Sequence, residues 1–497
     1  MFHRYLILAT IGLSFIPSAA AIAADTDIDQ GFAGTGHWQR LFESGSGSQH
    51  EYGVAHARTA DGGYVVAAKL PGGAANGGTG KRIGLFRLDH NGNFVISFGT
   101  NGKVIKDAWL TSVTDMTVDA QGRIIVIGTT PGQGGLGDFG VVRFNADGSD
   151  DTSFAGDGGT AVGFDVPTVA FDDFPASVLA ETDGRIVIAG STTPQNSTSR
   201  WAVLRLNENG SIDSSFGTIS DGQGGHLGST DTFIAGEPAT GRRILKIASG
   251  HYVITGTSMV SDSDHDFAAR ILTPMGEQWS GFAGSRRFAI DSSGPNGLLD
   301  DLADAVLVNP TTILLVGASG GRFAATRIIA TANSMNQYSD LDWDSTFIGS
   351  NLPGNPNVYV GDITDSIAGS AAVDASGRSW LVGFSTAQMR DGISALSGAG
   401  NAIDGSAAPY ANGLVTRLHP DGSPDLDFGG GNGFWFFSAP YTVSTLSYET
   451  VFTRVLFDGP QPVLLGSATY SIDSDYDFDG VITRLQSSDV IFANGYE

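Results

Sequence analysis

Short apolar runs separated by glycine-rich turns recur along the whole chain, with a period of about 60 residues. A typical run, residues 183–190, starts at an Asp-Gly turn and continues as Arg-Ile-Val-Ile-Ala-Gly. A run that is apolar at almost every position predicts a strand buried on both faces. Seven such runs end in a small residue: Ala68, Gly128, Gly190, Gly256, Gly317, Gly383 and Gly466.

Two further sets of seven residues keep the same rhythm, which indicates seven copies of one repeat. One set is an arginine followed by an apolar residue: Arg87, Arg143, Arg205, Arg270, Arg327, Arg417 and Arg484. The other is a phenylalanine, usually after Asp-x-x: Phe32, Phe98, Phe154, Phe216, Phe282, Phe347 and Phe428. Each phenylalanine precedes the next small residue by 30 to 40 positions.

Each repeat predicts four short strands. In the third repeat they are expected near residues 176–180, 185–189 and 201–206, and the fourth is expected to begin near Phe216. One such sheet cannot bury both faces alone, and antiparallel four-stranded units that stack radially form a propeller. We therefore expect an all-β fold, a seven-bladed β-propeller of four-stranded antiparallel blades.

The turns predict two different faces of this propeller. The connections between the first and second strands, and between the third and fourth, contain Asp-Gly or Asn-Gly, as at residues 183–184 and 209–210. These residues favour tight hairpins. The remaining connections are longer, and the blade topology gathers them on the opposite face.

The two ends of the chain predict how the ring closes. Residues 29–32 resemble the start of a fourth strand, whereas the last repeat stops after its third strand, residues 481–485. We expect the N-terminal strand to complete the last blade, with Asp29 opposite Arg484. Residues 489–492 also read Asp-x-x-Phe, but they follow Arg484 too closely to match the other repeats.

The repeated arginines have a structural explanation. Arg143 and Asp151 lie equally far from the turn residue Asp147, which predicts an ion pair across the hairpin, worth roughly 0.2–1 kcal/mol. Two further pairs share this spacing: Arg205 with Asp213, and Arg417 with Asp425.

The N-terminus resembles a secretory signal peptide at residues 1–24. A basic start, Arg4, precedes an apolar run over residues 5–16, and Ala21-Ile22-Ala23 fits the cleavage rule. We expect the propeller to cover residues 25–487 and a C-terminal tail to cover 488–497, with no transmembrane segment. The expected location is secreted, periplasmic or at the bacterial cell surface.

The amino-acid composition excludes some kinds of site and disfavours one kind of partner. The chain has no cysteine, which excludes disulfides and thiolate metal sites. Its 27 basic and 52 acidic residues give a net charge of −25, which disfavours nucleic acid as a partner. We expect a monomer.

The repeat resembles the delta-60 repeat family of β-propellers from secreted bacterial proteins. The resemblance rests on phrases such as those at residues 138–159, 183–190 and 204–217 and extends over about 27–486. It implies a propeller outside the cytoplasm and brings no catalytic residues. Residues 489–497 resemble a short terminal tail found on many secreted bacterial proteins, although a frayed terminus explains them equally well.

Three segments resemble enzyme motifs but lack the neighbouring structure or residues that those motifs need. Residues 135–140 match the G-x-G-x-x-G pattern, but a strand follows instead of the helix that a dinucleotide site needs. Residues 317–321 match G-x-S-x-G, but they connect two strands. His50-Glu51 lacks the second histidine of a zinc motif, since Val54 stands there.

One acidic segment suggests a metal site. Carboxylates at alternate positions can converge on Ca²⁺, and the candidates are Asp473, Asp475, Asp477 and Asp479. A shorter relative occurs at residues 262–266. The ligands that known calcium loops need further along are missing, because Thr483 and Gln486 stand there, so a solvated acidic loop is the alternative.

The sixth repeat carries an insertion over about residues 386–412. It lies on the long-loop face, where insertions in repeat proteins often mark a binding surface. Its most contact-capable side chains are Met389, Arg390 and Tyr410. A tolerated surface loop is the alternative.

These features favour a non-enzymatic binding module that presents its long-loop face to a glycan, a peptide or an envelope component. The first alternative is an enzyme that acts on a carbohydrate or lactone at the channel mouth, with a metal ion such as Ca²⁺. None of the nine histidines recurs with the repeat, which favours binding over catalysis. The second alternative is a structural component of the cell surface.

Overall fold

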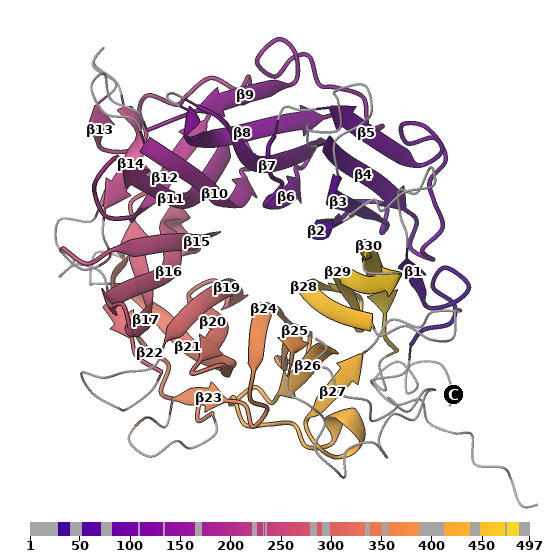
Figure 1. Ribbon diagram of the computed structural model, residues 1–497. Coiled ribbons are helices and arrows are strands. Elements are labelled where there is room, and N and C mark those ends of the chain that lie inside the picture. Colours follow the sequence, from indigo (N-terminus) through magenta and orange to yellow (C-terminus); the bar gives the residue numbers. More distant parts are fainter. Residues whose placement is uncertain are drawn as a thin grey trace, which may run out of the picture.

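Seven β-sheets are arranged in a ring around a central axis, as the sequence predicts (Figure 1). This computed structural model describes residues 28–39, 52–70, 82–107, 110–132, 135–164, 171–220, 226–231, 233, 236–278, 286–290, 299–332, 338–349, 355, 357–386, 412–437, 448–472 and 475–486. Adjacent strands pair antiparallel in every sheet. The fold is therefore a seven-bladed, all-β propeller.

Blades are numbered here in chain order. Blade 1 contains β2 (Tyr52–Arg58), β3 (Tyr64–Leu70), β4 (Arg82–Leu88) and β5 (Lys103–Asp107). Blade 2 contains β6 (Asp115–Val118), β7 (Ile124–Pro131), β8 (Gly137–Phe144) and β9 (Gly159–Val162). Blade 3 contains β10 (Phe171–Ala180), β11 (Ile186–Pro194), β12 (Arg200–Leu206), β13 (Ile219–Ser220) and β14 (His226–Asp231).

Blade 4 contains β15 (Ala239–Lys246), β16 (Tyr252–Ser261), β17 (Asp264–Leu272) and β18 (Arg286–Phe288). Blade 5 contains β19 (Asp300–Asn309), β20 (Thr312–Ser319), β21 (Arg322–Ala332), β22 (Tyr338–Trp343) and β23 (Val358–Val360). Blade 6 contains β24 (Ser366–Val373), β25 (Ser379–Ser385), β26 (Asn412–Leu418) and β27 (Phe434–Phe437). Two single turns of 3₁₀-helix, Ala248–Gly250 and Phe428–Gly430, lie between strands.

Blade 7 joins both ends of the described chain. Its strands are β28 (Tyr448–Asp458), β29 (Gln461–Ile472) and β30 (Asp475–Arg484), and β1 (His37–Gln39) pairs with β30 at the outer edge. Arg484 donates to the Asp29 carboxylate at 2.7–2.8 Å, as the sequence predicts. Phe32 is fully buried between blades 7 and 1.

The small residues of the repeat lie where the two innermost strands of each blade approach most closely. A Cβ atom added to Gly256 would lie 1.8 Å from the carbonyl oxygen of Thr240, and one on Gly190 would lie 2.0 Å from that of Phe174. Backbone oxygens cannot withdraw without breaking the sheet, so a larger side chain is excluded. The same contact explains Gly128, Gly317, Gly383 and Gly466.

The outer strand begins later than the sequence suggested. Phe216 is fully buried but lies in the turn after β12, and the strand that pairs with β12 is β14, which starts ten residues later at His226. The Asp-x-x-Phe segment is therefore a buried corner between the third and fourth strands. The Phe216 side chain turns inward there because it packs against the next blade.

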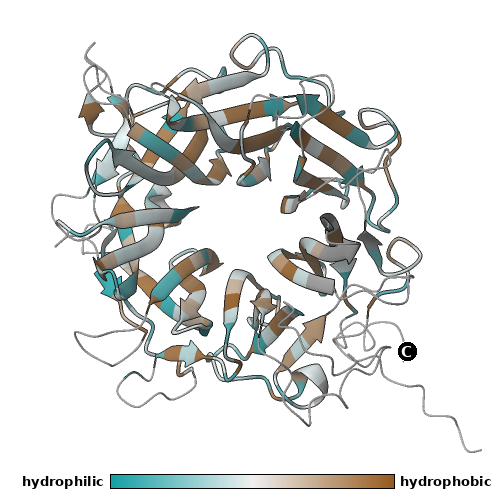
Figure 2. Ribbon diagram, in the orientation of Figure 1, coloured by the Kyte–Doolittle hydropathy of each residue, from teal (hydrophilic) through white to brown (hydrophobic). Residues whose placement is uncertain are grey.

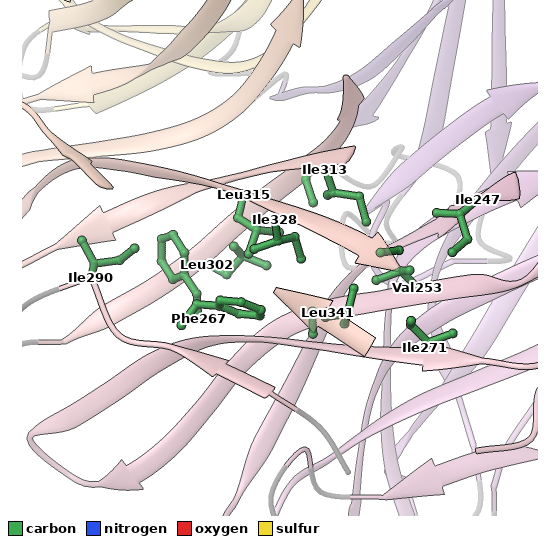
Figure 3. Close-up of a cluster of buried hydrophobic side chains, with 14 of the residues drawn as sticks. Ile247, Val253, Phe267, Ile271, Ile290, Leu302, Ile313, Leu315, Ile328 and Leu341 are labelled. Carbon is green, nitrogen blue, oxygen red and sulfur yellow. The ribbon is translucent and has the colours of Figure 1, made fainter. Parts of the chain in front are cut away.

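Apolar side chains fill the spaces between neighbouring blades. The cluster between blades 4 and 5 includes Ile247, Val253, Phe267 and Leu315, all at most 4% exposed (Figure 3). Similar clusters lie between the other neighbouring pairs of sheets. Apolar segments accordingly recur in every blade around the ring (Figure 2). The second strands are apolar on both faces because both faces are covered.

The repeated arginines are more buried than the sequence suggested. The three predicted ion pairs are present at 2.6–2.7 Å, but Arg205 is only 2% exposed. Its guanidinium also donates to the carbonyl of Pro274 in the next blade at 2.9 Å and lies over the Phe216 ring. Arg143 makes the equivalent contact with Glu208 O. These arginines therefore join neighbouring blades, and the small value expected for exposed pairs does not apply.

Candidate functional site

The innermost strands β2, β6, β10, β15, β19, β24 and β28 surround the central axis (Figure 1). In each strand, one residue pairs with the position just before the repeated small residue of the second strand. Six of these strands carry a β-bulge immediately before it. We call these seven residues the channel ring: Ala55, Asp115, Ser177, Arg243, Asp304, Ser370 and Arg454.

Arg243 of blade 4 is at the centre of an ion network in this ring. Its Nε donates to Asp304 of blade 5 at 2.7 Å, and its Nη1 donates to Asp115 of blade 2 at 3.1 Å. The second contact passes over blade 3, where the ring residue is the small Ser177. Burial opposes ionisation of Arg243, but the two carboxylates raise its pKa above the usual value.

Arg454 of blade 7 approaches the same carboxylate from the other side. Its Nη2 lies 3.6 Å from the Asp115 Oδ1, within ion-pair range but too far for a hydrogen bond. The blade between them contributes Ala55, which leaves room for the long side chain. Asp115 therefore connects blades 2, 4 and 7, and it also accepts from the backbone N–H of Val178 at 3.2 Å.

Asp304 is held in its ionised form. Burial alone would raise its pKa, but the charges of Arg243 and Arg454 and the Ser370 hydroxyl, which donates at 2.7 Å, keep the pKa below the usual value. The ring thus contains two carboxylates and two guanidinium groups, and its net charge is zero. The channel ring is therefore neutral, although the whole chain has a net charge of −25.

A cavity of about 400 Å³ adjoins the channel ring. Four ring residues line it: Asp115, Arg243, Ser370 and Arg454. The other lining residues follow the ring position in sequence on their strands, as Leu456 and Phe457 do on β28 and Val373 does on β24. Inner strands run toward the tight first turn of each blade, so the cavity lies on the tight-turn side of the ring.

The carboxylates and guanidinium groups of the ring are not equally accessible. The side chains of Arg243 and Arg454 are 19% and 18% exposed, whereas those of Asp115 and Asp304 are 5% and 2% exposed. The cavity therefore presents positive charge, backed by buried negative charge.

His56 adds a neutral polar group to the cavity wall. Its Nε2 lies 3.2 Å from the carbonyl oxygen of Val463, so in the neutral ring Nε2 carries the hydrogen and Nδ1 is an acceptor. Nδ1 is buried and has no hydrogen-bond partner among the described residues. Burial, aided by the Arg454 charge, lowers the pKa of His56 to about 4.

Sequence reasoning missed this site, although a signal was present. In six repeats the ring residue stands thirteen positions before the small residue, as Asp115 does before Gly128 and Arg243 before Gly256; in the seventh, Arg454 stands twelve positions before Gly466. Six of the seven residues at this position are polar or charged, and only Ala55 is apolar. That the charged ones pair across the channel depends on the ring geometry.

None of the site residues predicted from the sequence is among the described residues that line this cavity. Met389, Arg390 and Tyr410 lie outside the described residues. Asp473 also lies outside them, and Asp475, Asp477 and Asp479 are described only in their backbone, where they pair with β29 as part of β30. The segment expected to be a loop is thus mostly strand, and calcium binding there stays a prediction.

The described residues can also be searched for metal sites, for membrane-spanning helices and for the two glycine-rich motifs. No group of three or more histidine, aspartate or glutamate side chains among them is arranged to hold a metal ion. Within the same residues, no helix is long and apolar enough to cross a membrane. The G-x-G-x-x-G segment leads into β8, and the G-x-S-x-G segment ends β20 and turns into β21, so both lie in hairpins.

Two segments of the chain match a known sequence family. Residues 121–154 and 181–216 match a domain of unknown function (DUF5122) described as a β-propeller. These segments cover the second and third strands and the buried corner of blades 2 and 3. They support a propeller repeat. No curated protein matches the chain significantly.

The solved structures that align with this chain are distant from it in sequence. A protein of unknown function from Dyadobacter fermentans is 9% identical and aligns over 91% of this chain and 100% of its own, with a TM-score of 0.38. A GH43 endo-arabinanase from Bacillus licheniformis is 11% identical over 60% of this chain and 99% of its own, with a TM-score of 0.29. An α-L-arabinanase from Penicillium chrysogenum is 11% identical over 68% and 94%, with a TM-score of 0.35.

Proposed function

We propose that this protein is a non-enzymatic binding module of the bacterial envelope or exterior, and that its ligand site is the cavity beside the channel ring. The observation that carries the proposal is the exposure of Arg243 and Arg454 to a cavity of about 400 Å³, a volume within the range of small-molecule sites. The signal-like residues 1–24 and the delta-60 resemblance support the location.

The state of the ionisable groups favours binding over catalysis. A general acid or base must exchange a proton near neutral pH. The charges of Arg243 and Arg454 hold the pKa of Asp304 below its usual value against the effect of burial, and burial lowers the pKa of His56 to about 4. Fixed charges of this kind orient a ligand and do not transfer protons to it.

The long-loop face remains a second candidate surface for a glycan, peptide or envelope partner. On β24, Ile367 lies on the long-loop side of the ring and is 47% exposed, and Phe174 of β10 is 48% exposed. Those side chains and the 386–412 insertion would contact a larger partner. The two sites lie on opposite sides of the channel ring and can be tested separately.

A pair of variants on one strand tests which side binds. Ala372→Trp adds a large side chain at a residue that lines the cavity, whereas Ile367→Trp adds the same side chain to β24 on the other side of the ring. Thermal shifts would be measured for the mature protein and both variants against a panel of small metabolites and glycan fragments. We expect ligands that stabilise the wild type and Ile367→Trp but not Ala372→Trp.

The opposite pattern, in which Ile367→Trp loses the response and Ala372→Trp keeps it, would move the site to the long-loop face. Ligands that stabilise all three proteins equally would refute the cavity as the site. Ca²⁺ and EDTA belong in the same panel, because a shift reversed by EDTA would support metal binding at residues 473–480.

A further inference from the structure

We infer that the four charged residues of the channel ring act together as one ionic latch, which couples blades that are not neighbours and holds the propeller closed from the inside. The latch consists of Asp115, Arg243, Asp304 and Arg454, on the innermost strands of blades 2, 4, 5 and 7. This conformational role does not depend on whether the cavity binds a ligand.

The charges of the latch alternate in sign around the channel. In blade order they are aspartate, arginine, aspartate and arginine, so each charge stands between two charges of the opposite sign. The other three ring positions separate these charges and hold only small residues: Ala55, Ser177 and Ser370. A long arginine side chain can therefore reach an aspartate two blades away, and attraction acts between every pair of successive charges.

The contacts within the latch are close on one side of the channel and looser on the other. Arg243 donates through Nε to Asp304 at 2.7 Å and through Nη1 to Asp115 at 3.1 Å. Arg454 places its Nη2 3.6 Å from Asp115, and its charge also lowers the pKa of Asp304. Hydrogen bonds thus join blades 2, 4 and 5, whereas ionic attraction alone adds blade 7 to the latch.

Burial makes the four charges depend on one another. The side chains of Asp115 and Asp304 are only 5% and 2% exposed. Water and salt screen such pairs much less than pairs on the surface. Loss of one partner would leave the opposite charge buried and uncompensated, which costs more than the loss of an exposed pair.

The latch links parts of the ring that apolar packing does not link. Each apolar cluster between the blades packs two neighbouring sheets together. Asp115, in contrast, meets Arg243 over blade 3 and Arg454 over blade 1. The contact with Arg454 spans the junction of blades 7 and 1, where β1 adds only three residues to the outer edge. The latch therefore supports ring closure from the inner strands.

Double-mutant cycles, measured by urea unfolding of the mature protein, test the latch. Asp115→Asn removes a charge but keeps an oxygen for the Val178 N–H, and Arg243→Met keeps most of the side-chain length. Each single variant should lower the urea midpoint. We expect the double variant to have a midpoint no lower than that of the worse single variant, because it removes the charge that the single variant leaves uncompensated.

Two further cycles test whether the four charges act as one unit. Asp115→Asn with Arg454→Met should show coupling of the same sign but smaller, because 3.6 Å separates the two groups. Asp304→Asn with Arg454→Met should also be coupled, although no hydrogen bond joins these two among the described residues. The control is Asp115→Asn with Arg327→Met, which should be additive, because Arg327 is paired with Asp344 in the hairpin of blade 5.

Two results would overturn the latch. Additive midpoints in both cycles with Asp115 would show that the ring charges are energetically independent. Coupling in those cycles together with additivity of Asp304→Asn and Arg454→Met would reduce the latch to separate pairs. If Arg243→Met does not fold, Arg243→Gln takes its place in the same cycle. No ligand is present in these cycles, so failure of the latch would leave the cavity site to its own test.

Discussion

At the scale of single residues, the channel ring shows how one backbone position acquires different chemistry in each repeat. The same register position is alanine in blade 1, serine in blades 3 and 6, and charged in the other four. The small residues Ala55 and Ser177 leave space that the arginines of blades 7 and 4 use to reach Asp115. Divergence at this position makes the channel ring asymmetric within a repeated scaffold.

The burial of His56 predicts that the stability of the folded protein depends on pH. The pKa of His56 is lowered from 6.5 to about 4, mainly by burial, so the native state resists a proton that the unfolded state takes up. Stability should therefore fall as pH decreases from about 6.5 to about 4, by roughly 3 kcal/mol in total. His56→Gln should flatten this part of the profile, measured by urea unfolding between pH 7 and 4.5.

The control for this experiment is His90→Gln, since the His90 side chain is exposed. It should leave the profile of the wild type unchanged. An unchanged slope in His56→Gln would mean that the buried ring is not what makes the protein acid-sensitive.

At the scale of elements, the hairpin of the third and fourth strands is the unit that joins one blade to the next. The arginine of β12 bonds to Asp213 within its own blade and to Pro274 O in the next, and Gly217 N donates to Met275 O at 2.7 Å beside it. Blade 1 departs from this pattern. There Val95 replaces the aspartate, and Arg87 pairs with Asp61, which is 60% exposed.

This difference gives a matched pair of variants. Arg205→Met removes the ion-pair partner that lies 2.7 Å from the buried Asp213 carboxylate and leaves the Pro274 carbonyl without its donor, and we expect it to cost about 3–5 kcal/mol. Arg87→Met also removes a bond to the next blade, to the carbonyl of Ala146 at 3.1 Å, but its carboxylate partner is exposed, so it should cost only about 1–2 kcal/mol. Denaturant unfolding of both variants measures the difference, and equal costs would show that burial of the pair does not matter.

At the scale of the whole molecule, the N-terminal segment and the last three strands share blade 7. β1 is only three residues long, so its hydrogen bonds alone give little stability. The buried ring of Phe32 and the Asp29–Arg484 pair add the contacts that other blades make within one continuous hairpin. The ends of the described chain are thereby held together.

Phe32→Ala tests whether this composite blade behaves like the others. Phe32 and Phe216 are both fully buried at equivalent positions, so each substitution should cost about 3–5 kcal/mol in urea unfolding. A much smaller cost for Phe32→Ala would show that the N-terminal segment contributes little to the closed ring.

The sequence by itself determined the number of blades, the strand types and the arginine pairs. These depend on local periods: two residues along a strand, a turn at Asp-Gly, and a fixed spacing across a hairpin. The glycine positions were visible too, although their cause, a carbonyl oxygen 1.8–2.0 Å from a built Cβ, needed coordinates. The outer strands were misplaced because the buried Phe216 was taken for a strand residue when it packs in a corner.

Only the tertiary structure decided which charged residues meet in the channel ring. Asp115, Arg243 and Arg454 are separated by 128 and 211 residues, and no local pattern relates them. Closure of seven blades places Arg243 3.1 Å and Arg454 3.6 Å from the carboxylate of Asp115 across the channel. Spacing along a chain predicts contacts within one hairpin, whereas contacts across a ring depend on its closure and on which neighbours are small.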